Sequence, residues 1–203
     1  MAQKILGTLA QGLIFVISAP AGTGKTTLVR MLMKEFDCIA ESVSCTTRAP
    51  RTGELSGVDY FFLNTAEFER KIQEGNFLEY AKVFGYYYGT SKEYVLSQQQ
   101  AGKHVFLVID TQGAMQLKAD QFVASYIFLS PPSLDALKDR LHKRQTDSPA
   151  VIAHRLGEAE REMGMVENYD YHIVNDNLGN AYTILRSIVI AEEHRVRVNL
   201  RSK

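Results

Sequence analysis

Apolar residues occur along the chain in short continuous runs, not in the alternating pattern of half-exposed strands. The first run spans residues 13–17, and similar runs occupy residues 105–109, 126–129 and, more briefly, 173–174. A strand that is buried on both faces of a parallel sheet has this pattern. Segments with helical spacing separate the runs, so the sequence predicts an α/β fold with right-handed crossovers.

The stretch from about residue 42 to residue 92 has a different character. It is rich in Thr, Arg, Gly, Tyr and Phe, with short alternating pieces such as residues 58–63. We interpret it as an insertion with a small sheet of its own. Within it, Asn64 or Thr65 can cap a short helix that Gly75 ends. No repeat or long linker divides the sequence, so we expect a single domain over residues 1–203.

Composition narrows the class of protein. The chain has 203 residues, with 23 Lys and Arg against 23 Asp and Glu. This length supports a core without disulfides or a structural metal, and zero net charge argues against bulk attraction to nucleic acid or an anionic membrane. No run approaches the roughly 18 apolar residues of a membrane span. We expect a cytoplasmic protein in which Cys38 and Cys45 are reduced thiols.

The first apolar run leads into a glycine-rich loop, residues 18–27, that precedes a helical segment. In a P-loop, backbone N–H groups wrap a phosphate at a helix N-terminus, while Lys25 would reach the β- and γ-phosphate oxygens and Thr26 would ligate Mg²⁺. The strict pattern begins with Gly where this chain has Ala19, but Gly22 and Gly24 keep their offsets. The predicted ATP-binding loop comprises Ala19, Pro20, Ala21, Gly22, Thr23, Gly24, Lys25, Thr26 and Thr27.

The run at residues 105–109 ends in an acid, Asp110. This places a carboxylate at the C-terminal tip of a buried strand, where ligands of open α/β sheets collect. An Asp after a strand can also be only the cap of the next helix.

Four motifs of the insertion together resemble those of guanylate kinases: residues 44–54, 57–62, 77–81 and 87–91. The resemblance extends from about Leu13 to about His194. It implies a P-loop NTPase-type parallel sheet flanked by helices, with an inserted mixed-sheet arm that binds GMP and a helical lid. The implied core covers about residues 1–41, 93–132 and 158–203, the arm about 42–92 and the lid about 133–157.

The residues of the arm suit GMP. Arg48 and Arg51 carry planar forks that match a dianionic phosphate, and tyrosine hydroxyls can add hydrogen bonds without charge. Glu79 can accept hydrogen bonds from guanine N1–H and the 2-amino group, whereas adenine would place a lone pair against it. An ordinary surface of solvated arginines and strand tyrosines is the alternative. The implied GMP-binding set is Ser44, Arg48, Arg51, Tyr60, Glu79, Tyr88, Thr90 and Asp110.

A predicted helix after residue 133 places Arg140 and Arg144 on one face, where like charges repel unless an anion binds. Ser148 and Pro149 open a second helix, which carries Arg155. The resemblance implies that these three arginines meet the ATP phosphates when the lid closes. It also implies that Asn175 lies near the adenine.

The sequence departs from the family pattern at two places. Lys143 and Gln145 stand where glycines often flank the lid arginine, which affects lid flexibility. Val108 replaces the first of two acids that commonly end the third core strand. Asp110 therefore remains to contact either guanine or the water shell of Mg²⁺.

The resemblance implies the reaction ATP + GMP ⇌ ADP + GDP in purine nucleotide metabolism, with Mg²⁺ and with dGMP as a second acceptor. We expect direct in-line transfer, with Lys25, Arg51, Arg144 and Arg155 as catalytic residues. Two alternatives are a non-catalytic module that binds a phosphopeptide and a P-loop kinase for another phosphorylated ribose compound. The basic tail is either a homo-oligomer interface or a solvated end; it contains Arg195, Arg197, Arg201 and Lys203.

Overall fold

The computed structural model describes residues 4–83, 85–143 and 148–196. Its larger sheet has five parallel strands in the order β2-β7-β1-β8-β9. They are β1 (Ile14–Ser18), β2 (Ile39–Glu41), β7 (His104–Val108), β8 (Ser125–Ser130) and β9 (Tyr171–Val174). The predicted parallel α/β sheet is confirmed, with β2 as an edge strand that the apolar runs did not predict.

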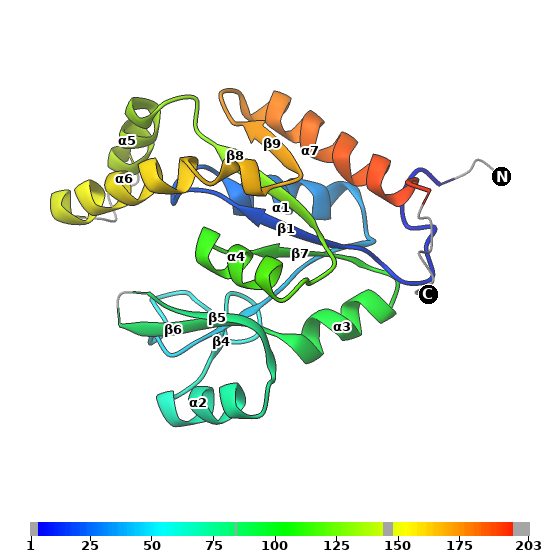
Figure 1. Cartoon of the computed structure of the whole chain (residues 1–203), viewed down its shortest axis with the longest axis horizontal. Helices are drawn as coiled ribbons and strands as arrows, with labels where there is room; N and C mark the ends of the chain where they lie inside the picture. Colours follow the sequence, from blue (N-terminus) through cyan, green and yellow to red (C-terminus); the bar gives the residue numbers. More distant parts are fainter. Residues whose placement is uncertain (1–3, 84, 144–147, 197–203) are drawn as a thin grey trace.

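Helices cover both faces of this sheet (Figure 1). Phe15 and Ile17 of β1 pack with α1 (Lys25–Glu35) and α7 (Leu178–Glu193). Ile14 and Val16 pack on the other face with α3 (Lys92–Gln100) and α4 (Thr111–Ala119). Successive side chains of a strand point to opposite faces, so burial between two helical layers requires apolar residues on both faces, as at residues 14–17 of β1. The last residue, Ser18, is buried with its hydroxyl donating to the carbonyl oxygen of Asp110.

The insertion forms a second, mixed sheet with the strand order β4-β3-β6-β5. Its strands are β3 (Ser44–Thr46), β4 (Phe61–Phe62), β5 (Phe77–Val83) and β6 (Tyr86–Ser91). Helix α2 (Thr65–Gln73) packs on it through Phe68, whose ring stacks on Phe77 and Tyr87. Asn64 caps α2 in a capping box with Glu67, as the sequence predicted.

The alternating pattern at residues 58–63 gives a strand of only two residues. The N–H groups of Val58 and Asp59 instead donate to the carbonyl oxygen of Leu55, at 3.2 and 3.0 Å. Gly57 has a φ of +81°, which other residues rarely adopt. A turn therefore occupies the first half of this stretch.

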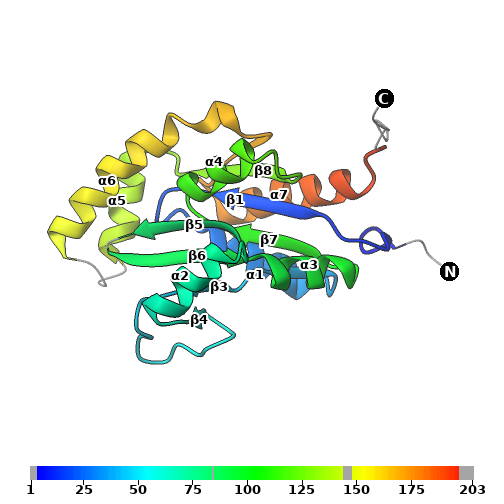
Figure 2. The ribbon, with the colours of Figure 1, turned by 60° about the horizontal axis from the view of Figure 1, so that its bottom comes forward.

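Helices α5 (Leu134–Lys143) and α6 (Pro149–Met163) pack against each other through a small apolar cluster that includes Leu137, Leu141 and Ile152. Ser148 caps α6, as expected. A 3₁₀ turn, η1 (Val166–Asn168), follows α6. Figures 1 and 2 show this helix pair on the same side of the molecule as strands β5 and β6, with the last turns of α7 at the opposite end.

At that opposite end, a buried carboxylate joins three distant segments. Glu193 of α7 accepts hydrogen bonds from the N–H groups of Gly7 and Thr8, at 2.7 and 2.8 Å. It also lies 2.6 Å from His104 Nε2, and His104 Nδ1 accepts the N–H of Leu13. Nε2 therefore carries the proton and donates it to Glu193. Burial alone would raise the pKa of Glu193, but the hydrogen bonds from Thr8, Gly7 and His104 outweigh it and lower the pKa to about 2.

Within the described ranges, none of the helices combines the length and the apolar character that a bilayer span requires.

Candidate active site

The P-loop connects the C-terminal end of β1 to α1. Gly22 and Gly24 have φ values of +95° and +106°. Lys25 Nζ donates to the carbonyl oxygen of Ala19 at 2.6 Å, and Asn175 Nδ2 donates to that of Thr23 at 2.7 Å. A Cβ on Gly24 would lie 2.9 Å from Asn175 Nδ2. The loop is thus held from within and from the end of β9.

Glycine also governs the start of α1. Gly24 caps this helix, and no side chain of the described residues makes the capping hydrogen bond. The first N–H groups of a helix have no partner within the helix, so those at the start of α1 suit a phosphate. Thr26 lies in this turn and is half-buried.

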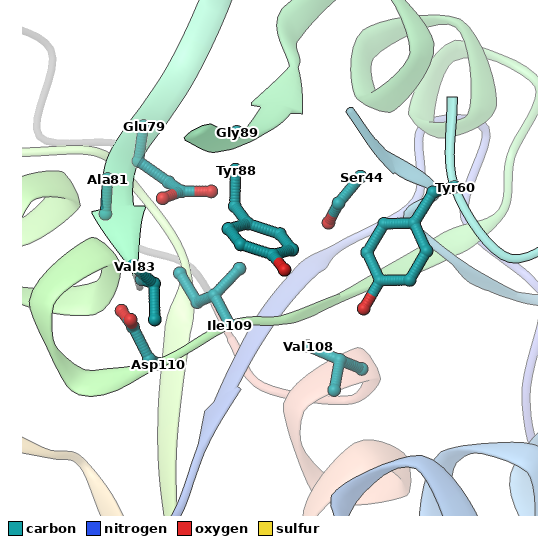
Figure 3. A pocket seen from close by; sticks show the side chains of 10 residues that line it. All are labelled: Ser44, Tyr60, Glu79, Ala81, Val83, Tyr88, Gly89, Val108, Ile109 and Asp110. Atoms are coloured by element: carbon teal, nitrogen blue, oxygen red, sulfur yellow. The ribbon is translucent and has the colours of Figure 1, made fainter. Parts of the chain in front are cut away.

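A cavity of about 210 Å³ lies between the two sheets. Five of the eight residues predicted to bind GMP line it: Ser44, Tyr60, Glu79, Tyr88 and Asp110. Figure 3 shows the Tyr60 and Tyr88 hydroxyls and the Glu79 carboxylate around one space. Val108, which replaces the expected acid, lines the same cavity.

Glu79 has an unusual environment for a carboxylate, since only 5% of the residue is exposed. Burial raises its pKa to about 7, the hydrogen bond from Thr90 opposes this shift, and the charge of Asp110 adds to it. Thr90 Oγ1 donates to Glu79 Oε1 at 2.6 Å. Thr90, predicted to contact guanine, therefore uses its proton to orient Glu79.

Helix α4 makes room for this carboxylate. A Cβ on Gly113 would lie 2.5 Å from Glu79 Oε2. The N–H of Gly113 donates to Asp110 Oδ1 at 2.9 Å, so Asp110 caps α4. Asp110 also lines the cavity. The structure confirms that Asp110 caps α4. Its contact with a ligand stays a prediction, with which its place in the cavity wall agrees.

A second cavity, of about 480 Å³, shares Tyr88 and Asp110 with the first. Three predicted catalytic residues line it: Lys25, Arg51 and Arg155. They come from α1, from the insertion and from α6. Other lining residues are Ala19, Ala21, Lys82, Val83, Gln112, His154, Glu158 and Glu162.

Two acids of this second cavity, Glu158 and Glu162, were not predicted. They follow Arg155 by three and seven residues on α6, so the three share one helix face. This spacing was the signal available in the sequence. Glu162 Oε1 accepts a hydrogen bond from Thr111 Oγ1 at 3.2 Å. Burial raises the pKa of Glu162, and the charge of Lys25 opposes the shift.

Arg48 lies beside the cavities with its guanidinium already paired. Its Nη2 donates to both carboxylate oxygens of Glu54, at 2.9 and 3.0 Å, and its Nη1 donates to the Ala49 carbonyl at 2.8 Å. The guanidinium carbon is 5.3 Å from the centre of the Tyr60 ring. The hydrogen bond that Arg48 donates to Glu54 raises the pKa of Arg48.

The predicted lid arginines occupy different places. Arg140 Nη2 donates to the carbonyl oxygen of Asn175 at 2.7 Å, whereas Arg155 lines the larger cavity. Arg144 lies outside the described residues. Asn175, predicted to lie near adenine, is 5% exposed and uses its amide on the P-loop.

Across the described parts of the chain, no group of three or more His, Cys, Asp or Glu side chains could hold a metal ion by itself. Oxygen donors in this region include the Thr26 hydroxyl at the start of α1 and three carboxylates that line the larger cavity with Lys25: Asp110, Glu158 and Glu162. Mg²⁺ is usually bound through one or two protein oxygens, substrate phosphates and water, so this donor set fits it.

Comparison with known proteins gives one consistent result. The family model described as guanylate kinase matches residues 11–192. The guanylate kinase of Protochlamydia amoebophila is 55% identical over 190 residues, which cover 94% of this chain and 96% of that protein. The guanylate kinase of Idiomarina loihiensis is 46% identical over 197 residues, or 96% and 91% of the two chains. The crystal structure of guanylate kinase from Anaplasma phagocytophilum has a TM-score of 0.73, at 32% identity, with 98% and 95% of the chains covered.

Proposed function

The chain belongs to the guanylate kinase family and phosphorylates GMP with ATP, and from this premise we propose which of its residues perform the transfer. The relatives favour this reaction over the two alternatives, a non-catalytic module and a kinase for another phosphorylated ribose compound. The proposal rests on one observation, that the two cavities have lining residues in common. Tyr88 and Asp110 line both, so a nucleotide in the smaller cavity has its reacting end in the larger one.

The smaller cavity binds the guanine base of GMP or dGMP. Ionised Glu79 accepts hydrogen bonds from N1–H and the 2-amino group of guanine, while Ser44 and Asp110 line the remaining space. Adenine presents no donor at the equivalent ring nitrogen. A buried carboxylate left without a donor costs binding, so the same contact rejects AMP.

Arg48, Arg51, Tyr60 and Tyr88 bind the phosphate of GMP. Two guanidinium groups match the charge and the planar geometry of a phosphate dianion, and the phenols add hydrogen bonds. Arg51 and Tyr88 line the larger cavity, and Tyr60 and Tyr88 line the smaller one. These positions support a phosphate at the junction between the cavities.

The P-loop binds the ATP phosphates through the N–H groups of residues 19–27, and Lys25 contacts the β- and γ-phosphate oxygens. Arg140, Arg144 and Arg155 approach the same phosphates when the lid, residues 133–157, closes. Asn175 lies next to the loop that holds them. Closure excludes water, which protects ATP from hydrolysis.

Mg²⁺ accompanies ATP, with Thr26 as its protein ligand and Asp110 at its water shell. When bound, the ion would supply positive charge that offsets the charge developing on the phosphate oxygens. The protein's own cations then stabilise the migrating phosphoryl group. The phosphate oxygen of GMP attacks in line with the departing ADP oxygen, so no covalent intermediate forms on the protein.

Replacement of Lys25 tests this mechanism. We expect Lys25→Ala to lower kcat by about 10²-fold or more with GMP and with dGMP, because a cation fixed at the migrating charge is lost. A coupled ADP-release assay measures kcat, and circular dichroism checks the fold. The matched control is Lys34→Ala at the exposed end of the same helix, which should retain normal turnover. Near-normal kcat in Lys25→Ala would contradict the mechanism.

A further inference from the structure

One carboxylate of the insertion contacts both phosphate-binding arginines. Glu54 accepts from Arg48 Nη2 with both of its oxygens, and its Oε2 also accepts the backbone N–H of Arg51 at 2.8 Å. The side chains of Arg48 and Glu54 are only 13% and 19% exposed. Glu54 therefore links Arg48 and Arg51, which are three residues apart in the sequence and for which we propose the same phosphate as ligand.

The local backbone brings Glu54 into this position. Its own N–H donates to the carbonyl oxygen of Arg51 at 3.0 Å, which closes a turn. Gly53 within this turn has a φ of +89°, where other residues are strained. The Glu54 side chain then folds back over the turn, so the chain from Arg48 to Glu54 surrounds a single carboxylate.

Aromatic rings hold the other side of Arg48. Its guanidinium carbon lies 5.3 Å from the centre of the Tyr60 ring and 6.0 Å from that of Phe62. An arginine held between a carboxylate and aromatic rings keeps few rotamers, so little side-chain entropy remains to be lost when a phosphate binds.

Glu54 does not have to leave when the phosphate arrives. A guanidinium carries five N–H donors in a fixed fork. The bonds to Glu54 and Ala49 involve Nη2 and Nη1, so the fork can serve an additional anion while those contacts persist.

We propose that Glu54 is a positioning residue for the GMP phosphate, which fixes the orientation of Arg48 and the turn that carries Arg51. This inference rests on the proposed role of the two arginines. It predicts that Glu54 contributes to GMP affinity without touching the nucleotide, and that the contribution concerns the phosphate and not the base.

The test separates the two ends of the nucleotide. In Glu54→Gln, KM for GMP should rise by about tenfold or more, because a charge-assisted contact to each arginine segment is weakened. The inhibition constant of guanosine, which has no phosphate, and KM for ATP should stay at their wild-type values. The matched control is Glu74→Gln, which removes the charge from another carboxylate paired with an arginine of the same arm, the exposed Arg70–Glu74 pair. It should change none of these constants.

Arg48→Ala distinguishes the inference from its premise. We expect this variant to raise KM for GMP. In the double variant, Glu54→Gln should then have a smaller further effect, because only its contact with the Arg51 backbone remains. If Arg48→Ala leaves KM for GMP unchanged, the phosphate site and the inference both fail. If Arg48→Ala weakens GMP but Glu54→Gln does not, the inference alone is wrong. Tighter GMP binding in Glu54→Gln would make Glu54 a competitor, and equal losses for guanosine and ATP would indicate general damage; both overturn the inference.

Discussion

The proposed recognition of guanine depends on pH, because it requires Glu79 to be ionised. An ionised carboxylate accepts hydrogen bonds from guanine, whereas a protonated one turns an O–H toward the guanine N–H groups. Burial raises the pKa of Glu79 to about 7. The binding-competent form is therefore dominant at pH 8 and scarce at pH 6.

We expect the inhibition constant of guanosine against GMP to rise by about tenfold between pH 8 and pH 6, the change in ionised fraction that this pKa implies. Guanosine is the suitable probe because GMP itself has a phosphate that titrates in this range. Glu79→Gln should bind guanosine more weakly at pH 8 and give a flat pH profile. A flat profile for the wild-type protein would contradict recognition by an ionised Glu79.

The sequence identified half of the residues that line the two cavities, because short motifs carry them. Lys25 follows from the P-loop, and Glu79 from the motif at residues 77–81. Glu162 could not be found in this way, since its place depends on how α6 lies over Thr111. Thr90 was placed correctly in the arm, but its contact with Glu79 needs the register of β5 on β6.

At the scale of the element, helix α4 has a glycine, Gly113, at the point where it faces the Glu79 carboxylate. Alanine favours helix over glycine by about 1 kcal/mol, so Gly113→Ala should not weaken α4 as a helix. Its Cβ would nevertheless lie 2.5 Å from Glu79 Oε2 and must displace the carboxylate. We expect KM for GMP to rise by about tenfold or more while KM for ATP is unchanged, as measured by steady-state kinetics.

Gly157→Ala provides the control for that substitution. Gly157 lies inside helix α6, and among the residues that the structure describes none outside the neighbouring helix backbone comes within 4 Å of the Cβ it would carry. This variant should gain thermal stability from the same helix propensity and keep the wild-type KM for GMP. Equal values of KM in Gly113→Ala and the wild type would show that Glu79 tolerates the added methyl group.

The elements also show where the hydrophobic pattern is informative. Continuous apolar runs located β1, β7 and β8, because these strands are buried almost throughout. The short run at residues 173–174 located β9, but this edge strand is not buried on both faces as expected, since only Ile173 is buried. Strand β2 has three residues and only two apolar positions, Ile39 and Ala40, too few for a pattern. β2 is defined as a strand by its pairing with β7, which the sequence pattern does not show.

At the scale of the whole molecule, Glu193 links the amino-terminal segment, β7 and α7. Its pKa of about 2 in the folded protein lies below the ordinary value of 4.5. The ionised form is thus favoured by folding, and its stabilisation is present above pH 4.5 and lost as the pH falls toward 2. Integrated over this window, the contribution is about 3 kcal/mol.

Urea denaturation of Glu193→Gln measures this contribution. The variant should be less stable than the wild type by about 3 kcal/mol at pH 6, and the difference should shrink as the pH is lowered to 3. Glu160→Gln, at an exposed position on α6, should match the wild type throughout. A difference that does not depend on pH would exclude the charge of Glu193 as its source.

The sequence alone does not predict how the residues of the site come together in space. Lys25, Arg51, Asp110 and Arg155 come from four separate segments and line a single cavity. Local patterns describe each segment, but their convergence depends on strand order and on how α6 packs. Zero net charge along the chain is likewise an average that does not describe this cavity, which is lined by four cations and three acids: Lys25, Arg51, Lys82, Arg155, Asp110, Glu158 and Glu162.

The P-loop has a consequence for the thermodynamics of nucleotide binding. Its backbone is held by Lys25 and by the Asn175 amide before any phosphate is present. The conformational entropy of this loop is therefore lost during folding, and nucleotide association does not have to overcome it. Such a loop should give a small entropy penalty for binding and an on-rate that is not limited by rearrangement.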